Sequence, residues 1–261
     1  FKMSKIFAIA NQKGGVGKTT TAVNLAAGLV KEGREILGID LDPQSNMSEY
    51  LGYDGNSMYN ISDLMVAAAN NKLSSEIIAG SIVHSPEGID YIPSNIKLAS
   101  ADLFLSNVMC REQILKRILK RKEFKEYDCL IIDCLPSLGI LLTNALAAAD
   151  SLIIPVQAQK FSLDGLVQLE QVYSMVKLNV NPDLEIEGVL LTMADNTKMS
   201  KDVESALENK YGEVFFRTRI HRSVEATNST YEQKSLVTMK NSRLGIEYIN
   251  VTKELIERGR V

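Results

Sequence analysis

Strand-like and helix-like segments alternate along this chain of 261 residues, and the alternation predicts an α/β fold. We expect a doubly wound, mostly parallel sheet with helices on both faces. Two segments carry the prediction: residues 128–134 (DCLIIDC) and 151–157 (SLIIPVQ) are apolar runs bounded by polar residues. Such runs are typical of strands that are buried on both faces of a parallel sheet. Ligands of these sheets bind at the carboxyl ends of the strands.

The other expected elements are assigned from hydrophobic periodicity and from turn residues. Helices whose ends carry a signal are 19–33, which ends at Gly33, and 201–212, which is closed by Gly212. The remaining expected strands are 5–10, 34–42, 88–94 and 186–194, and the remaining expected helical stretches are 60–69, 98–109, 111–122 and 162–178.

Length and composition favour one domain that spans residues 1–261, because 45% of the residues are hydrophobic and no repeat or linker interrupts the chain. Phe1 and Lys2 precede a methionine and are left out of the fold prediction. No apolar stretch is long enough to cross a bilayer, and no hydrophobic signal region precedes the first strand. Three cysteines without C-x-x-C spacing fit a reducing compartment. We therefore expect a cytoplasmic protein with no membrane partner.

Residues 11–20 (NQKGGVGKTT) lie between the first strand and the first helix, and their composition indicates a phosphate-binding loop. Glycines let the loop bring its own amide groups around an anion, because side chains would block that approach. Lys18 lies where a P-loop lysine reaches the β- and γ-phosphates, and Thr19 lies where a hydroxyl binds Mg²⁺. Strand, loop, Lys-Thr pair and helix occur together, so this signal is specific.

The loop departs from the general P-loop pattern at Gln12, where the first glycine is expected, and it carries an additional lysine, Lys13. The sequence KGGVGKTT resembles the deviant Walker A loop of the ParA/MinD class of P-loop ATPases. The resemblance implies ATP and Mg²⁺ as cofactors, and a homodimer bridged by ATP in which Lys13 reaches the nucleotide of the partner subunit. It implies this nucleotide-binding set: Lys13, Gly14, Gly15, Val16, Gly17, Lys18, Thr19 and Thr20.

Two acidic residues end the second expected strand, and both project towards the nucleotide if this strand neighbours the first. Residues 40–46 (DLDPQSN) resemble the DxDPQGN motif of the family. The match implies that Asp42 positions the attacking water, so that Lys13, Lys18 and Asp42 are the catalytic residues, and that Asp40 lies near the Mg²⁺ shell. Ser45 replaces the usual glycine. The alternative is a pair of acids at a strand end that faces solvent.

Asp133 ends the apolar strand 128–134, where a P-loop ATPase needs a carboxylate for its metal. The predicted metal set is therefore Thr19, Asp40 and Asp133. Leu135 replaces the first proline of the DxPPS motif that is common in the family. Without the P-loop, an aspartate at this position is an N-cap about as often as a ligand.

The formal net charge is −3, so nucleic-acid binding would need a local basic patch. Residues 111–125 carry seven Lys or Arg against two Glu, and a solvated face of an amphipathic helix is favoured over a DNA or partner site.

Near the C-terminus, one family arginine that contributes to DNA binding is missing and the other aligns with Glu225. His221 occupies a usual proline position and is interpreted as structural. The candidate DNA contacts are Lys198, Lys201, Arg217, Arg219 and Arg222.

The resemblance implies an ATP-dependent dimerising ATPase that acts in the partition of a plasmid, a mobile element or a chromosome. In this hypothesis the ATP-bound dimer binds double-stranded DNA without sequence preference and associates with the nucleoid, and a ParB-like centromere-binding protein stimulates hydrolysis. The alternative is a membrane switch of the MinD type or another DNA-independent positioning ATPase, although residues 248–261 lack an apolar tip. Metal-cluster carriers need paired cysteines, and tyrosine autokinases need a tyrosine-rich tail. A dethiobiotin-synthetase-like ligase stays open.

Overall fold

The structure is a computed structural model that describes residues 4–159 and 162–259. Its centre is a seven-stranded sheet with the strand order β3-β4-β2-β5-β1-β6-β7. All neighbouring strands are parallel except β3 and β4. The strands are β1 (Lys5–Ile9), β2 (Ile36–Leu41), β3 (Val83–His84), β4 (Asp90–Ile92), β5 (Cys129–Cys134), β6 (Ser151–Gln157) and β7 (Glu185–Thr192). The predicted α/β fold with a mostly parallel sheet is confirmed.

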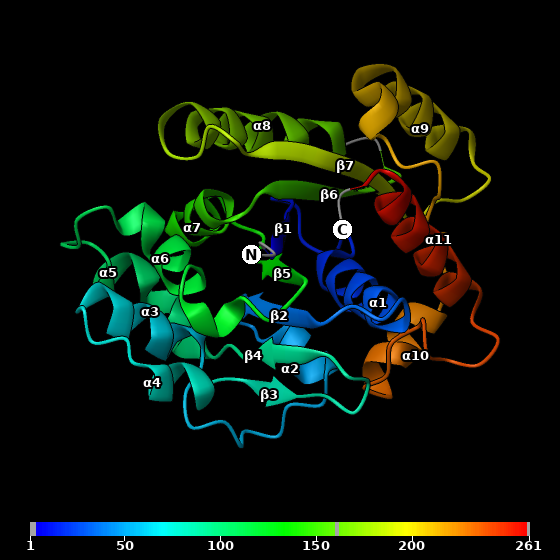
Figure 1. The fold of residues 1–261 in the computed structure, drawn as a ribbon. Helices are drawn as coiled ribbons and strands as arrows, with labels where there is room; N and C mark the ends of the chain where they lie inside the picture. The colour runs from blue at the N-terminus through cyan, green and yellow to red at the C-terminus, as the bar shows by residue number, and fades with distance from the viewer. Residues whose placement is uncertain (1–3, 160–161, 260–261) are drawn as a thin grey trace.

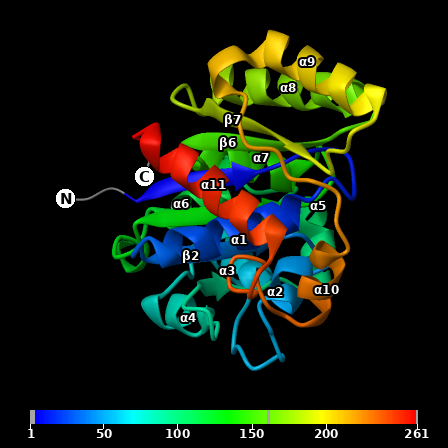
Figure 2. The same ribbon diagram turned by 90° about the vertical axis from the view of Figure 1, so that its right-hand side faces the viewer.

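Helices cover both faces of this sheet, with α1 and α11 on one face and α3, α6 and α7 on the other (Figure 1). Figure 2 shows α11 packed along α1 on the first face. The helices are α1 (Lys18–Lys31), α2 (Asn46–Tyr50), α3 (Ile61–Ala69), α4 (Ser75–Ala79), α5 (Ala101–Phe104), α6 (Ile114–Leu119), α7 (Ile140–Ala148), α8 (Ser162–Asn179), α9 (Lys198–Tyr211), α10 (Glu225–Tyr231) and α11 (Arg243–Glu257). Within the described residues, no helix is long and apolar enough to span a membrane.

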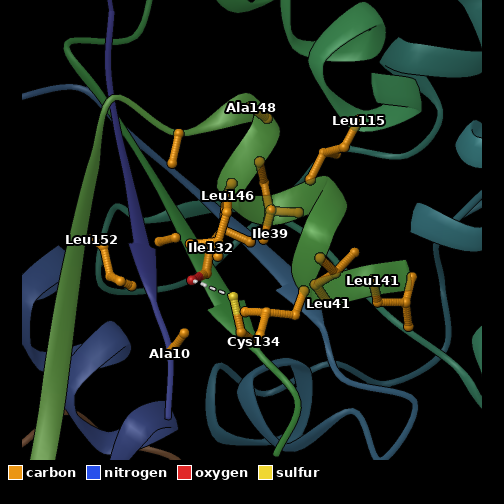
Figure 3. Packing of buried hydrophobic residues seen from close by; sticks show 14 of the residues in the cluster. Ala10, Ile39, Leu41, Leu115, Ile132, Cys134, Leu141, Leu146, Ala148 and Leu152 are labelled. Atoms are coloured by element: carbon orange, nitrogen blue, oxygen red, sulfur yellow. Dashed lines mark hydrogen bonds between the residues drawn. The ribbon is translucent and has the colours of Figure 1, made fainter. Parts of the chain in front are cut away.

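Successive residues of the central strands feed two hydrophobic cores, because side chains alternate between the faces of a strand. Phe7 and Ile9 of β1 pack with α1 and α11, whereas Ala8 and Ala10 belong to the core on the opposite face. Figure 3 shows the second core, in which Ile132 of β5 packs near α7. Both faces are therefore covered, which explains the continuous apolar runs in the sequence.

The carboxyl ends of β1, β5 and β2 meet at one edge of the sheet, but β1 and β2 are not neighbours. β5 lies between them, and its Asp133 is level with Ile9 on one side and with Asp40 on the other. We expected Asp40 and Asp42 to project towards the nucleotide if β1 and β2 were neighbouring strands. The structure separates these two strands, so that condition is not met. Asp133 instead stands between the P-loop strand and Asp40.

The expected helix over residues 111–122 is wrong in its length, because α6 spans six residues and stops at Leu119. Arg121 has an extended backbone, with φ −66° and ψ 150°, and it precedes a short 3₁₀ turn, Lys122–Phe124. The guanidinium of Arg121 donates a hydrogen bond to the carbonyl of Leu73. This tertiary contact, together with burial of Phe124, outweighs the helical periodicity of the segment.

Candidate functional site

The P-loop is fixed by one contact within the loop and by two contacts from remote parts of the chain. The side-chain amide of Asn11 donates to the carbonyl of Pro155 at 2.7 Å, and its oxygen accepts from the backbone N–H of Lys13 at 2.9 Å. The hydroxyl of Thr192, at the end of β7, donates to the carbonyl of Val16 at 2.8 Å. The loop is therefore held to β6 and β7 as well as to its own strand.

Two glycines of the loop adopt backbone angles that favour glycine: φ is +70° at Gly15 and +85° at Gly17. Apart from the chain neighbours, no described residue has an atom within 4 Å of the position that a Cβ would take at Gly14 or Gly15. The loop leads directly into α1, whose first residue is Lys18. Free amides at a helix N-terminus attract anions, so the loop and α1 together form a phosphate cradle.

The two lysines of the loop are held in different ways. The ammonium of Lys18 donates to the carbonyl of Lys13 at 3.1 Å and lies inside the cradle. Burial lowers the pKa of Lys18, and the nearby carboxylate of Asp133 opposes that shift. The ammonium of Lys13 donates to the side chain of Gln159 at 3.0 Å, beyond the end of β6. Lys18 is thus directed into the loop, whereas Lys13 is directed towards the segment that follows β6.

Asp133 is buried at the end of β5, and neither of its carboxylate oxygens has a hydrogen-bond partner among the described residues. Burial raises the pKa of Asp133 well above the usual range, and the neighbouring Asp40 adds to the shift. Thr19 and Lys18 act in the opposite direction. An unpartnered buried carboxylate is costly without a cation, so this position fits a metal ion or its bound water.

Asp40 is also buried, but hydrogen bonds occupy its carboxylate. It accepts from the backbone N–H of Asp42 at 3.1 Å, and from the backbone N–H and the hydroxyl of Ser48 at 2.8 and 2.6 Å. Burial raises the pKa of Asp40 to about 6, and these hydrogen bonds oppose the rise. Asp40 therefore fixes the loop that carries Asp42, and its place beside Asp133 fits an outer contact to a metal.

The loop that follows β2 turns sharply at Ser45. A side-chain oxygen of Asp42 accepts from the N–H of Gln44 at 2.9 Å. Ser45 has φ +60°, in the left-handed region where glycine is favoured, and it immediately precedes α2. The family glycine at this position is thus explained by the backbone, and serine occupies it here with some strain.

A cavity of about 830 Å³ opens beside the P-loop, within the range of small-molecule sites. Asp42 and residues of α2 and α10 share its lining with the loop. The lining includes Gly14, Gly15, Gly17, Lys18, Thr19, Thr20, Asp42, Asn46, Tyr50, Tyr231 and Gln233. The described residues contain no cluster of three or more His, Cys, Asp or Glu that could hold a metal by itself. Mg²⁺ suits such a site, because it takes one or two protein ligands together with phosphates and waters.

Sequence reasoning missed three residues that position the loop: Asn11, Gln159 and Thr192. Asn11 lies inside the quoted motif, and its amide type was the available signal. Gln159 and Thr192 follow strands that are remote in the sequence, so no local pattern indicated their contacts. Residues 160 and 161, which continue the segment after Gln159, lie outside the described residues.

The candidate DNA contacts form what we call the C-terminal basic surface: Lys198, Lys201, Arg217, Arg219 and Arg222. Lys198 and Lys201 are exposed in the first turns of α9, and Arg222 is exposed near the end of β7. Arg219 forms an ion pair with Glu204 of α9. Arg217 lies 3.6 Å from Glu257 and 4.0 Å from Glu254 of α11. The structure therefore neutralises part of this surface.

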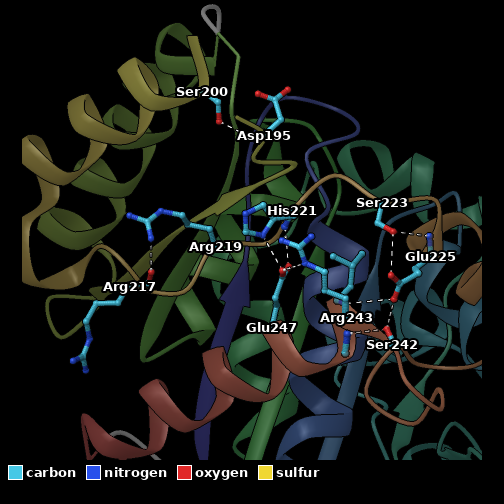
Figure 4. Close-up of polar contacts among 12 residues, drawn as sticks. Asp195, Ser200, Arg217, Arg219, His221, Ser223, Glu225, Ser242, Arg243 and Glu247 are labelled. Carbon is cyan, nitrogen blue, oxygen red and sulfur yellow. Dashed lines mark hydrogen bonds and ion pairs between the residues drawn. The ribbon is translucent and has the colours of Figure 1, made fainter. Parts of the chain in front are cut away.

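The segment that carries these arginines is tied to α11 by acidic side chains (Figure 4). Glu247 accepts from the ring nitrogen of His221 at 2.8 Å and from the N–H of the same residue at 2.9 Å. Glu225 accepts from the hydroxyl of Ser242 at 2.5 Å, and this contact is the main cause that lowers the pKa of Glu225. These contacts support the structural interpretation of His221.

The parallel sheet, the glycine loop before α1 and the buried acid at the end of β5 define a P-loop nucleotide-binding protein. A family model described as an AAA domain matches residues 4–186. The sporulation initiation inhibitor protein Soj of Bacillus subtilis (strain 168) is 40% identical over 98% of this chain and 100% of its own length. The chromosome partitioning protein ParA of Myxococcus xanthus is 36% identical over 98% of this chain and 89% of its own length. The chain belongs to this Soj/ParA family of P-loop ATPases.

Solved structures agree with this assignment. The cobyrinic acid a,c-diamide synthase of Mycobacterium smegmatis, with bound ADP and magnesium, has a TM-score of 0.84 and 32% identity, over 99% of this chain and 96% of that chain. A plasmid partition protein of Borrelia burgdorferi has a TM-score of 0.77 and 26% identity, over 98% of this chain and all of the other. The family resemblance stated from the sequence is confirmed.

Proposed function

We propose that this chain is one Mg²⁺-dependent ATPase domain whose ATP-bound homodimer binds DNA during partition of a plasmid, a mobile element or a chromosome. ATP and Mg²⁺ are its ligands, in agreement with the similar structure that holds ADP and magnesium. The observation that carries the proposal is the buried carboxylate of Asp133 beside the phosphate cradle of the P-loop, which accepts no hydrogen bond from the part of the chain that the structure describes. The partition role is inferred from the relatives.

Different residues at the P-loop edge bind ATP and promote its hydrolysis. The amides of residues 14–20 and the ammonium of Lys18 bind the phosphates of ATP. Thr19 and Asp133, with Asp40 beside Asp133, would hold Mg²⁺, and the ion would neutralise charge on the phosphates of ATP. Asp42 aims the attacking water, because it lines the cavity beside the P-loop on a loop that Asp40 fixes.

Lys13 is the residue proposed to join two subunits. Its ammonium is directed away from the cradle of its own subunit and towards Gln159. When a second copy of the chain approaches this face, Lys13 can bind the phosphates of the nucleotide that the second copy holds. Dimerisation then depends on ATP, because the phosphates provide the charge that Lys13 binds.

DNA binding is proposed for the C-terminal basic surface of the dimer. Lys198, Lys201 and Arg222 are exposed there and form no ion pair among the described residues, although Asp195 lies near Arg222. Phosphate contacts of this kind carry no base information, so binding is independent of DNA sequence. In the cell the ATP-bound dimer is cytoplasmic and associates with the nucleoid, and a ParB-like protein stimulates hydrolysis.

The test compares Asp42→Ala with Lys13→Ala. Asp42→Ala is expected to bind ATP, to accumulate as a dimer and to lose hydrolysis, because the cradle is intact while the water is no longer aimed. Lys13→Ala is expected to bind ATP and to stay monomeric. Light scattering measures the dimer fraction. Equal dimer fractions for Lys13→Ala and the wild type, or wild-type hydrolysis by Asp42→Ala, would contradict the assignments.

The DNA arm uses fluorescence anisotropy on two unrelated duplexes across a salt series. The Asp42→Ala dimer is expected to bind both duplexes with equal affinity, with ATP required and with a steep loss of binding as salt rises. Binding that ignores nucleotide, or no binding by this dimer at low salt, would favour a DNA-independent positioning ATPase instead.

A further inference from the structure

The basic segment 111–125 is divided by the structure into two sets of side chains with different environments. Its arginines that follow Ile114 point to backbone carbonyls: Arg117 donates to Ala68 at 3.1 Å and Arg121 donates to Leu73 at 3.3 Å. These two residues therefore fasten α6 to the region of α3 and α4. Lysines of the same segment take no part in these contacts.

Three of these lysines, with Lys5 of β1, surround a cavity of about 780 Å³. Apolar side chains of β1, α6, β5 and α7 form much of its lining. Its lining residues are Ser4, Lys5, Ile6, Lys116, Leu119, Lys120, Phe124, Lys125, Leu130, Ala148 and Asp150. A volume of this size is typical of ligand pockets, and apolar walls with a few charged groups are their usual composition.

The positive charge around this cavity is not neutralised by the described residues. No carboxylate among them forms an ion pair with any of the four lysines. The ammonium of Lys116 has a 3.5 Å contact with the amide oxygen of Asn181. Asp150 is the acid in the lining, and it accepts from the backbone N–H of Ile6 at 2.8 Å. Four ammonium groups against this one carboxylate leave a net formal charge of 4 − 1 = +3 in the lining. The cavity is therefore complementary in charge to an anionic ligand.

The cavity lies at the opposite edge of the sheet from the P-loop. Lys5 is the first residue of β1 and Leu130 is the second residue of β5, whereas the P-loop and Asp133 lie at the other ends of these strands. A ligand at this edge does not compete with ATP. Binding here is expected to be independent of nucleotide.

We propose that this cavity binds an acidic peptide segment of a partner protein, with one apolar side chain inside and carboxylates on the lysines. The apolar lining favours this occupant over duplex DNA, because DNA presents a convex row of phosphates and no apolar group that could enter a cavity. A rim of lysines also steers an acidic partner and excludes a basic one.

The probe is a fluorescein-labelled peptide, Glu-Glu-Phe-Glu-Glu, measured by anisotropy with the full chain, with and without ATP and Mg²⁺. The variant Lys116→Glu/Lys120→Glu is expected to weaken binding by about tenfold or more, because it reverses two charges on one side of the cavity. Its matched control is Lys72→Glu/Lys122→Glu, which makes the same charge change at exposed lysines outside the lining. The control is expected to change binding by less than about twofold.

Two further measurements test the apolar part of the site. Replacing Phe of the peptide by Ala, or making Ala148→Leu in the protein, is expected to weaken binding severalfold without any change of charge. ATP hydrolysis at the wild-type rate verifies that each variant is folded. No binding of the Phe peptide at low salt, equal losses for both lysine pairs, or wild-type affinity of Ala148→Leu and of the Ala peptide would overturn the proposal. Loss of anionic-vesicle or duplex binding in Lys116→Glu/Lys120→Glu, with peptide binding intact, would overturn it in favour of a lipid or DNA site.

Discussion

The P-loop edge and the C-terminal basic surface both bring charged residues together, but they treat those charges differently. At the P-loop edge, the carboxylate of Asp133 is buried without a hydrogen-bond partner among the described residues, and Lys18 lies inside a cradle of glycine amides. On the C-terminal basic surface, Arg219 is paired with Glu204 and Arg217 lies near two glutamates of α11. Uncompensated buried charge indicates a ligand, whereas compensated surface charge indicates a weaker site.

The largest effect is expected from Lys18→Ala. The variant should weaken ATP–Mg²⁺ binding by about a hundredfold or more, because charge-assisted contacts to the phosphates are lost. Isothermal titration calorimetry measures the affinity. Unchanged affinity would mean that the P-loop edge is not the ligand site, and the comparison between the two regions would fail.

Asp133→Asn tests whether the buried carboxyl of Asp133 destabilises the protein in the absence of its ligand. Without nucleotide, the free energy of unfolding at pH 7 is expected to rise by roughly 1–3 kcal/mol, because a buried carboxyl whose oxygens accept no hydrogen bond from the described residues is replaced by a neutral amide. Hydrolysis is expected to fall by about a hundredfold or more, since the metal loses its carboxylate. Urea unfolding and phosphate release measure the two effects, and a less stable variant at pH 7 would contradict the interpretation.

The same variant has a defined pH dependence. The pKa of Asp133 is raised in the folded state, so the folded wild type binds a proton more readily than the unfolded chain does. Wild-type stability therefore rises as pH falls from 7 towards 5, and Asp40, with a pKa of about 6, contributes in the same direction. The stability gap between Asp133→Asn and the wild type should narrow over this range.

Glu204→Gln tests whether an ion pair weakens DNA binding by the C-terminal basic surface. It removes the acid that neutralises Arg219, so duplex binding by the ATP-bound Asp42→Ala protein is expected to strengthen by about two- to fivefold. Glu208→Gln is the control, because Glu208 lies one turn further along α9 and forms no ion pair with any residue that the structure describes. Equal gains from both variants would mean that general charge, rather than release of Arg219, decides the affinity.

The smallest effect is expected from Ser45→Gly. Ser45 has φ +60°, and glycine adopts this backbone without the strain that a Cβ causes. The variant is expected to gain about 0.5–1 kcal/mol in stability, because relief of strain is partly offset by the entropy of glycine in the unfolded chain. Thermal unfolding measures the gain, and a loss of stability would show that the left-handed turn is not strained.

Much of the P-loop edge could be predicted from the sequence, because its signals are local. The glycines, the Lys-Thr pair and the apolar strand that carries Asp133 near its end each follow from the spacing of residues along a short stretch of chain. The alternation of strands and helices in the same way determined a mostly parallel sheet. Local spacing also explains two failures of element length, since the periodicity over 111–122 continues past Leu119, where α6 ends, and that over 98–109 continues past Phe104, where α5 ends.

The tertiary structure decided which charges have partners. In the fold, β5 lies between β1 and β2, and the P-loop contacts Gln159 and Thr192. Lys116 and Lys120 line a cavity, whereas Arg117 donates to the carbonyl of Ala68. Each of these facts depends on residues that are far apart in the sequence. Burial and pairing are properties of the assembled neighbours, so a charged residue in a linear pattern does not by itself reveal whether a salt bridge, a carbonyl or a ligand will meet it.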